Sequence, residues 1–171
     1  MDIQENFVNK VAQSGLITVD LAKYYPQEEI QVYDIKDNLF HGLILKEKDF
    51  RDFVKDHDWS QYTGKQIAIT CSTEAIVPTW AYMLLANRLA PFAAGIHFGT
   101  KEEVLTQLYV QAIQAIDFMQ YQDERIVVKG CGDIFVPEQA FVAFTSRLSA
   151  VAKSIMYGEP CSTVPVFKRK N

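Results

Sequence analysis

The sequence lacks a long, uninterrupted apolar run. Its most apolar stretch, residues 75–86, spans only twelve residues and is interrupted by Pro78 and Thr79, whereas a membrane-spanning helix needs about 20 apolar residues. The first ten residues, MDIQENFVNK, carry acidic side chains, and no apolar segment follows them as it would in a secretory signal. We therefore expect a cytoplasmic protein without a membrane anchor.

The sequence also lacks a strong charge of either sign. Its net charge is -4 and charged residues make up 22% of it, so it has no general attraction for nucleic acid or anionic lipid. Hydrophobic residues make up 49% of the 171 residues, enough for a chain of this length to bury a core. These totals predict one folded domain over residues 1–171 that binds neither nucleic acid nor membrane.

Cysteine is scarce, and the usual catalytic motifs are missing. The three cysteines are Cys71, Cys131 and Cys161, an odd number that argues against a disulfide framework in a reducing compartment. We expect them to be thiols, metal ligands or redox groups. The sequence has no Walker loop, dinucleotide-binding fingerprint, HExxH or CxxC motif, so no motif identifies a reaction.

The sequence does contain an internal similarity. Residues 58–99 align with residues 117–158 at a constant offset of 59, without a gap and with identity at twelve positions, where about two or three would match by chance. We interpret the two segments as copies of one supersecondary unit. The identical pairs include Asp58/Asp117, Tyr62/Tyr121, Pro78/Pro137 and Gly99/Gly158.

Each copy predicts a strand, a loop of small residues, a helix opened by Val-Pro, and a short second strand. We expect the first strands at 66–70 and 125–129 and the second strands at 96–98 and 155–157. The helix of the first copy is apolar on most sides, so we expect it to be the more buried of the two.

Other elements are expected outside and between the copies. Thr100 and Glu103 form a capping box that begins a helix running to about Met119. Earlier segments predict helices over 5–13 and 50–57 and strands over 30–35 and 39–45. The fold class is therefore α/β: a layered, largely parallel or mixed central sheet with flanking helices.

Two cysteines lie where the first strands of the copies end. If both copies share one parallel sheet, those ends meet at the edge where such sheets bind ligands, and the helix that follows each loop favours a thiolate. This placement predicts a zinc or iron site with three thiolate ligands. The ligands would be Cys71, Cys131 and Cys161, with Asp133, His97 or Glu74 as the fourth.

Other interpretations stay open. The spacings of 60 and 30 residues match no zinc-finger signature, so each cysteine can instead be a small buried residue. Cys131 is a candidate nucleophile for a thiol enzyme that handles persulfides. A third interpretation is a non-catalytic interaction module that uses the basic tail, Lys168 to Lys170, or the acidic N-terminal third.

Several strings carry a resemblance to a known family: GLILKEKDFRDF, HDWSQYTGK, ITCSTEAIVPTWAYMLLA, VVKGCGD and GEPCSTVPVFKRK. In this order they resemble the bacterial family called domain of unknown function 2480, over nearly the whole chain. The family has no assigned activity, so the resemblance implies none for this chain. Genes of the family often lie near sulfur-mobilisation genes, which implies a protein partner in iron-sulfur cluster assembly; a homo-oligomer is equally compatible with the sequence.

Overall fold

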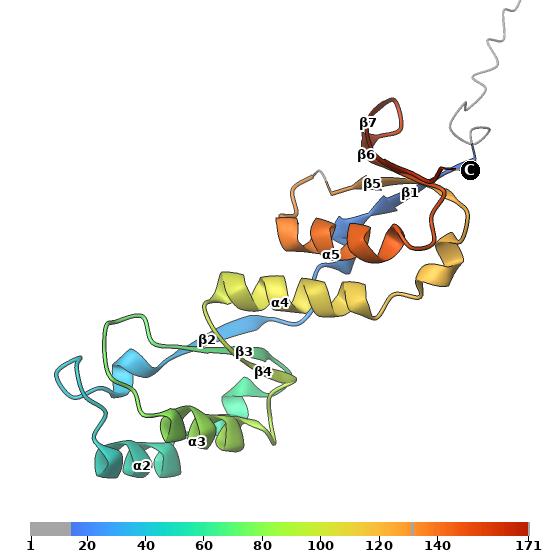
Figure 1. The fold of residues 1–171 in the computed structure, drawn as a ribbon. Helices are drawn as coiled ribbons and strands as arrows, with labels where there is room; N and C mark the ends of the chain where they lie inside the picture. Colours follow the sequence, from blue (N-terminus) through green and yellow to red (C-terminus); the bar gives the residue numbers. More distant parts are fainter. Residues whose placement is uncertain (1–14, 131, 171) are drawn as a thin grey trace, which may run out of the picture. The chain divides into compact units, whose positions relative to one another are not determined.

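The computed structural model describes residues 15–130 and 132–170 (Figure 1). The helix predicted over residues 5–13 lies outside these residues. Contacts divide the described residues into two compact units. Unit 2 is Pro26–Leu108, and unit 1 consists of residues 15–25, 109–130 and 132–170. The single domain predicted over residues 1–171 stays a prediction, and each unit is described by itself below.

Unit 2 contains a three-stranded parallel sheet in the order β2-β3-β4. Its helices α2 and α3 supply side chains to the same core cluster as β2 and β3. The elements are β2 (Ile30–Asp34), α2 (Glu47–Asp56), β3 (Gln66–Thr70), α3 (Thr79–Leu89) and β4 (Gly95–Phe98), with 3-10 turns η2 (Ile35–Asn38) and η3 (Trp59–Tyr62). Helix α4 (Lys101–Gln114) begins in this unit and ends in unit 1.

Unit 1 contains a four-stranded mixed sheet in the order β1-β5-β6-β7. The first three strands are parallel, and β7 is antiparallel to β6. The elements are β1 (Leu16–Asp20), β5 (Arg125–Lys129), α5 (Glu138–Leu148), β6 (Ser154–Glu159) and β7 (Ser162–Lys168), with 3-10 turns η1 (Leu21–Tyr24) and η4 (Phe118–Tyr121).

The two units share an order of elements that follows the offset of 59 residues. The series η3, β3, α3 and β4 corresponds to η4, β5, α5 and β6. In all four pairs the first residues of the corresponding elements differ by 59. The buried residues Phe50 and Val54 of α2 likewise correspond to Tyr109 and Ile113 of α4. The common origin of the copies stays an interpretation, but the structural likeness extends beyond the segments that the sequence aligned.

An aspartate begins each of the four 3-10 turns. In each case one carboxylate oxygen accepts a hydrogen bond from the backbone N–H two residues later, at 3.0 to 3.1 Å. This local hydrogen bond favours a turn over an extended backbone, so the chain turns after the preceding strand or loop. The four residues are Asp20, Asp34, Asp58 and Asp117.

Corresponding residues fill the cores of the two units. In unit 2, Ile67 and Ile69 of β3 pack with Leu85 and Leu89 of α3, because alternate strand residues and every fourth helix residue point to the same side. Unit 1 buries the corresponding set: Ile126, Val128, Phe144 and Leu148. Helices α3 and α5 each bury three residues at corresponding positions. They differ in that Trp80 of α3 is half-buried where its counterpart Gln139 is exposed, so the first copy's helix is the more buried at this one position.

The α/β fold class with parallel and mixed sheets is confirmed, and so is the capping box. Thr100 Oγ1 accepts from the Glu103 N–H at 3.2 Å, and Glu103 Oε2 accepts from the Thr100 N–H at 2.7 Å. The helix it begins ends at Gln114 rather than near Met119. Residues 39–45 form two isolated bridges, Phe40 with Ile44 and Ile44 with Ile76, instead of the predicted strand. The one central sheet expected for both copies is corrected to two sheets.

The C-terminal segment is a strand rather than an irregular tail. Residues 160 and 161 form a two-residue turn between β6 and β7. Before this turn Gly158 has a φ of +121°, and Gly99, its counterpart after β4, has a φ of +135°, a region that favours glycine. None of the described helices is both long and apolar enough to cross a membrane.

Candidate binding site

The two cysteines that the structure describes lie in different units. Cys71 follows β3 in unit 2, is half-buried, and donates from Sγ to the Thr73 carbonyl at 3.4 Å. Burial raises the pKa of Tyr82, and the neighbouring Cys71 raises it further. Cys161 is exposed in the turn between β6 and β7 of unit 1. Cys131 lies outside the described residues.

The predicted histidine ligand is engaged at the opposite end of its sheet from Cys71. His97 lies in β4, and its Nε2 is 2.8 Å from Oε1 of Gln66, the first residue of β3. Burial lowers the pKa of His97, so its imidazole is neutral at neutral pH. Cys71 comes after the last residue of β3. The structure therefore does not bring His97 and Cys71 together.

The described residues do not assemble a metal-ligating cluster. Among residues 15–130 and 132–170, no three His, Cys, Asp or Glu side chains are grouped so that they could hold a metal ion. Asp133 and Cys161 belong to unit 1, while Cys71 and His97 belong to unit 2. The zinc or iron site, which also includes Cys131, stays a prediction, and the described donors by themselves do not fit it.

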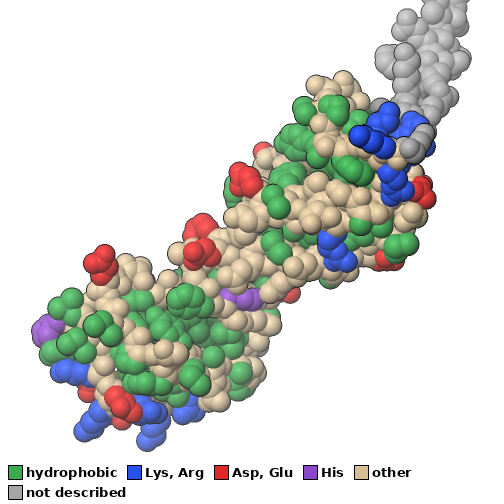
Figure 2. Space-filling view, viewed as in Figure 1, with side chains coloured by type: hydrophobic (Ala, Val, Ile, Leu, Met, Phe, Trp, Pro, Cys, Tyr) green, Lys and Arg blue, Asp and Glu red, His purple; other side chains and the backbone are tan. Residues whose placement is uncertain are grey.

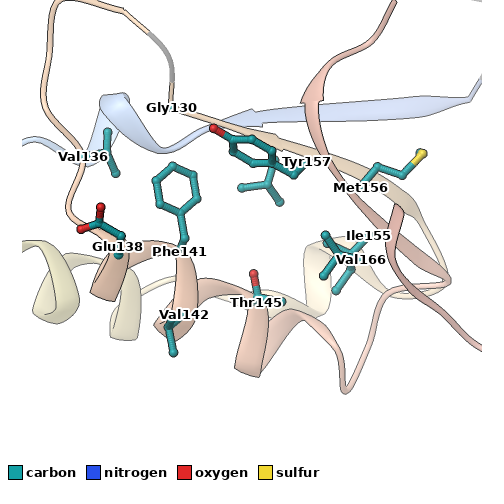
Figure 3. A pocket seen from close by; sticks show the side chains of 11 residues that line it. Gly130, Val136, Glu138, Phe141, Val142, Thr145, Ile155, Met156, Tyr157 and Val166 are labelled. Atoms are coloured by element: carbon teal, nitrogen blue, oxygen red, sulfur yellow. The ribbon is translucent and has the colours of Figure 1, made fainter. Parts of the chain in front are cut away.

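An apolar hollow of about 520 Å³ lies between α5 and the strands β5 and β6 (Figure 3). Phe141 rises from α5 toward the end of β5 and meets the Tyr157 ring edge to face, with centroids 5.8 Å apart. A Cβ on Gly130 would lie 2.6 Å from Phe141 Cζ, so glycine is needed for this close approach. Glu138 and Thr145 add polar groups on the helix side.

Unit 2 has a smaller hollow of about 280 Å³ in the same place. Every residue that lines it is the offset partner of a residue lining the apolar hollow of unit 1. Its aromatic pair, Tyr82 and Phe98, also meets edge to face, at 5.4 Å. Because the hollow recurs, it follows from how a helix lies over two parallel strands in this fold. The lining residues are Ile69, Tyr82, Met83, Ala86, Ile96, His97 and Phe98.

A second hollow in unit 1, of about 530 Å³, is surrounded by basic side chains. Strands β5 and β6 begin at this edge of the sheet and the antiparallel β7 ends there, so Arg125, Ser154 and Lys168 are paired in a row across three strands. Lys153 precedes β6 and Arg169 follows β7. We call this the basic hollow, and Figure 2 shows Lys and Arg side chains gathered near the C-terminal end of the chain.

Arg169 fastens the end of β7 to the turns that precede β5 and β6. Its guanidinium is paired with the Asp123 carboxylate and donates to the Val151 carbonyl at 2.7 Å, and its N–H donates to the Lys153 carbonyl at 3.0 Å. Hydrogen bonds from Gln122 and Arg169 hold the pKa of Asp123 below its usual value. Arg169 therefore holds in place the strand end that lines the basic hollow, but the Asp123 carboxylate largely offsets the charge of Arg169 itself.

Reasoning from the sequence found only part of this basic group. The basic tail was noted, but Arg125 and Lys153 were not, because strand pairing alone brings them beside the tail. A signal for β7 was present: a short turn, Pro160 and Cys161, separates two β-prone runs. Pro165 within the second run concealed it, since proline is uncommon in strands except at an edge, which is where β7 lies.

Comparison with known proteins agrees with the resemblance seen in the sequence. No curated protein and no solved structure matches the chain. A family described as "Protein of unknown function (DUF2480)" matches residues 5–169, nearly the full length. The chain belongs to this family.

Proposed function

We propose that this protein is a binding protein that holds an acidic segment of a partner protein in the basic hollow. One observation carries the proposal: three separate stretches of chain bring four basic side chains around one depression. They come from the start of β5, the residue before β6, and the end of β7. Cations gathered in this way attract and orient an anionic partner.

The basic hollow keeps much of its charge available. Among residues 15–130 and 132–170, Arg125 and Lys168 form no ion pair, whereas Arg169 is paired with Asp123. Arg125, Lys153 and Lys168 are all exposed. Exposed side chains of this length can reach carboxylates on a partner without first breaking internal ion pairs.

The floor of the basic hollow favours a protein segment over a free anion. Leu16, Met156, Pro165 and Phe167 contribute apolar surface to it. An apolar centre with a charged rim is the usual organisation of a protein interface. A segment with one apolar residue between carboxylates would satisfy both parts.

The basic hollow is not a consequence of the shared fold. At the offset of 59 residues, Arg125 corresponds to Gln66 and Lys153 to Ala94, both uncharged, and unit 2 has no described strand in the place of β7. The apolar hollow, by contrast, recurs in both units. The charge that distinguishes unit 1 is therefore the better indication of function.

Fluorescence anisotropy with a labelled peptide tests the proposal. The probe is a Glu-rich peptide with a central Leu, compared with the same peptide carrying Gln in place of Glu. We expect the Glu peptide to bind more tightly and its affinity to fall as salt is added. The double substitution Arg125→Gln and Lys168→Gln should weaken binding about tenfold, as the loss of two rim charges implies.

A matched control removes two charges elsewhere. Lys48→Gln with Lys55→Gln changes the net charge equally, at exposed positions of α2 in unit 2, and should leave the affinity unchanged. Equal affinity for the Glu and Gln peptides would overturn the proposal. So would equal weakening by the control, because the attraction would then depend on total charge rather than on the basic hollow.

The cysteine chemistry predicted from the sequence is a separate proposal. A zinc or iron site would use Cys71, Cys131 and Cys161, with Asp133, His97 or Glu74 as the fourth ligand. The thiol alternative would use Cys131 alone. Metal analysis of untagged protein purified anaerobically, with single Cys→Ser variants, tests the first; the pH dependence of thiol alkylation tests the second. Acidic-peptide binding should persist in every Cys→Ser variant.

A further inference from the structure

The outer edge of β4 in unit 2 has no partner strand among the described residues. The sheet order there is β2-β3-β4, so β4 ends the sheet. In unit 1 the corresponding strand, β6, is paired along residues 154–159 by the antiparallel β7. Unit 1 therefore shows that an antiparallel strand can pair with the edge that corresponds to the outer edge of β4.

The β4 edge also lacks the charges and proline that usually protect a sheet edge, although the Phe98 carbonyl accepts a hydrogen bond from the Gln107 side chain of α4 at 3.4 Å. Its sequence, Gly-Ile-His-Phe, contains no charged residue and no proline, whereas the edge strand β7 contains Pro165 and ends with Lys168. Natural proteins guard exposed edges with such residues because an unguarded edge pairs with other chains. An edge without them is expected to be paired in the native protein.

Apolar side chains continue the edge onto α3. Met83 and Phe98 are each 68% exposed, and both line the small hollow between α3 and β4. In unit 1, Val166 of β7 lines the corresponding hollow. A strand paired with β4 would thus cover apolar surface as well as satisfy backbone groups.

We propose that β4 pairs with β4 of a second copy of this chain, antiparallel and across a two-fold axis, so that two three-stranded sheets join into one of six strands. The antiparallel direction is the one that β7 takes beside β6. A two-fold contact requires a surface that complements itself. The neutral, apolar edge of β4 meets this condition.

The charges at the two ends of β4 fit the same arrangement. Helix α3 lies between two parallel strands in the chain, so its last turn, with Arg88, is at the amino end of β4. Lys101, Glu102 and Glu103 follow the carboxyl end in the first turn of α4, with a net charge of -1. Antiparallel pairing places the amino end of one β4 beside the carboxyl end of the other, which brings opposite charges to the same side.

Sedimentation of the full-length chain tests the proposal, with a control that the repeated fold provides. Met83→Glu introduces a charge beside the open edge, and Val142→Glu introduces it at the corresponding position of unit 1, which is also 68% exposed. We expect a dimer at micromolar concentration. Met83→Glu should raise its dissociation constant at least about tenfold, while Val142→Glu leaves it unchanged.

Hydrogen exchange identifies the contact independently of these substitutions. The backbone amides of β4 should be protected at concentrations where the dimer forms and should exchange faster on dilution or in Met83→Glu. A monomer at high micromolar concentration would overturn the proposal. A dimer that tolerates Met83→Glu, or one whose β4 amides exchange at the same rate at every concentration, would overturn it as well.

Discussion

Truncation of one buried leucine should reveal whether the two units unfold separately. Leu85 of α3 is fully buried in the core of unit 2, and replacing such a leucine with alanine costs about 2–5 kcal/mol of unfolding free energy. Unit 2 has roughly 80 residues, for which about 4–12 kcal/mol of total stability is typical. The substitution Leu85→Ala therefore removes a large fraction of the stability of this unit.

The chain offers a selective probe for the measurement. Both of its tryptophans, Trp59 and Trp80, lie in unit 2, so tryptophan fluorescence follows that unit, while far-UV circular dichroism follows the whole chain. With an m value of about 1.5 kcal/mol per molar urea, a loss of about 3 kcal/mol lowers the fluorescence midpoint by about 2 M.

The corresponding substitution in unit 1 is the control. Phe144, at the offset of 59 residues from Leu85, is also fully buried, and Phe144→Ala should cost about 3–5 kcal/mol. It should shift the circular dichroism transition and leave the tryptophan midpoint in place. If Phe144→Ala lowered the tryptophan midpoint as much as Leu85→Ala does, the reasoning from two separate cores would be refuted and one cooperative domain would be supported.

Three further predictions concern single side chains. Burial acts to raise the pKa of Asp34, but hydrogen bonds, the strongest from Ser72, outweigh it and lower this pKa; stability from Asp34 is therefore present above its unfolded pKa and lost as pH falls through the folded value. Asp34→Asn should lower the tryptophan-monitored urea midpoint at neutral pH, with the difference shrinking in acid, and an equal difference at both pH values would contradict this. Burial raises the pKa of Tyr121 to about 12, and burial also raises the pKa of other tyrosines. The ultraviolet titration at high pH should therefore lose one tyrosinate in Tyr121→Phe; identical titrations of the two proteins would disprove it. Gly130→Ala would place a Cβ 2.6 Å from Phe141 Cζ and should cost about 1–3 kcal/mol by circular dichroism in urea, whereas an unchanged midpoint would mean that the ring moves freely.

Local sequence patterns predicted the elements of the copies well. The strands expected at 66–70 and 125–129 have these bounds in the structure, and each Val-Pro is followed directly by a helix. These features depend on residues close together in the chain: alternation within a strand, and a proline whose missing N–H costs nothing at a helix start. The hydrogen bonds between Thr100 and Glu103 could be predicted for the same reason, since the two residues of a capping box are only three positions apart.

Pairing between distant segments could not be predicted in the same way. β1 pairs with β5, more than one hundred residues later, and the whole of unit 2 lies between them in the chain. Nothing in LITVD or RIVVK identifies the partner, because pairing depends on which surfaces the complete fold leaves to be covered. The expectation that both copies share one sheet failed at this level, and with it the expectation that their strand ends meet at one edge.

The candidate site was missed for the same reason, and the repetition within the chain shows how it can be recognised. Comparison of the units separates what the fold produces from what one copy has added: the hollow beside the aromatic pair occurs twice, but the basic rim and β7 occur in unit 1 alone. Strand β7 therefore explains two differences between the units: the covered edge of β6 and the basic rim of unit 1. In unit 1, β7 covers the edge of β6 and brings Lys168 to the basic hollow. In unit 2, no strand among the described residues takes the corresponding place beside β4, which we propose is taken by a second chain. Acidic-partner binding and self-association would thus use different units, so each can be removed by substitution without loss of the other.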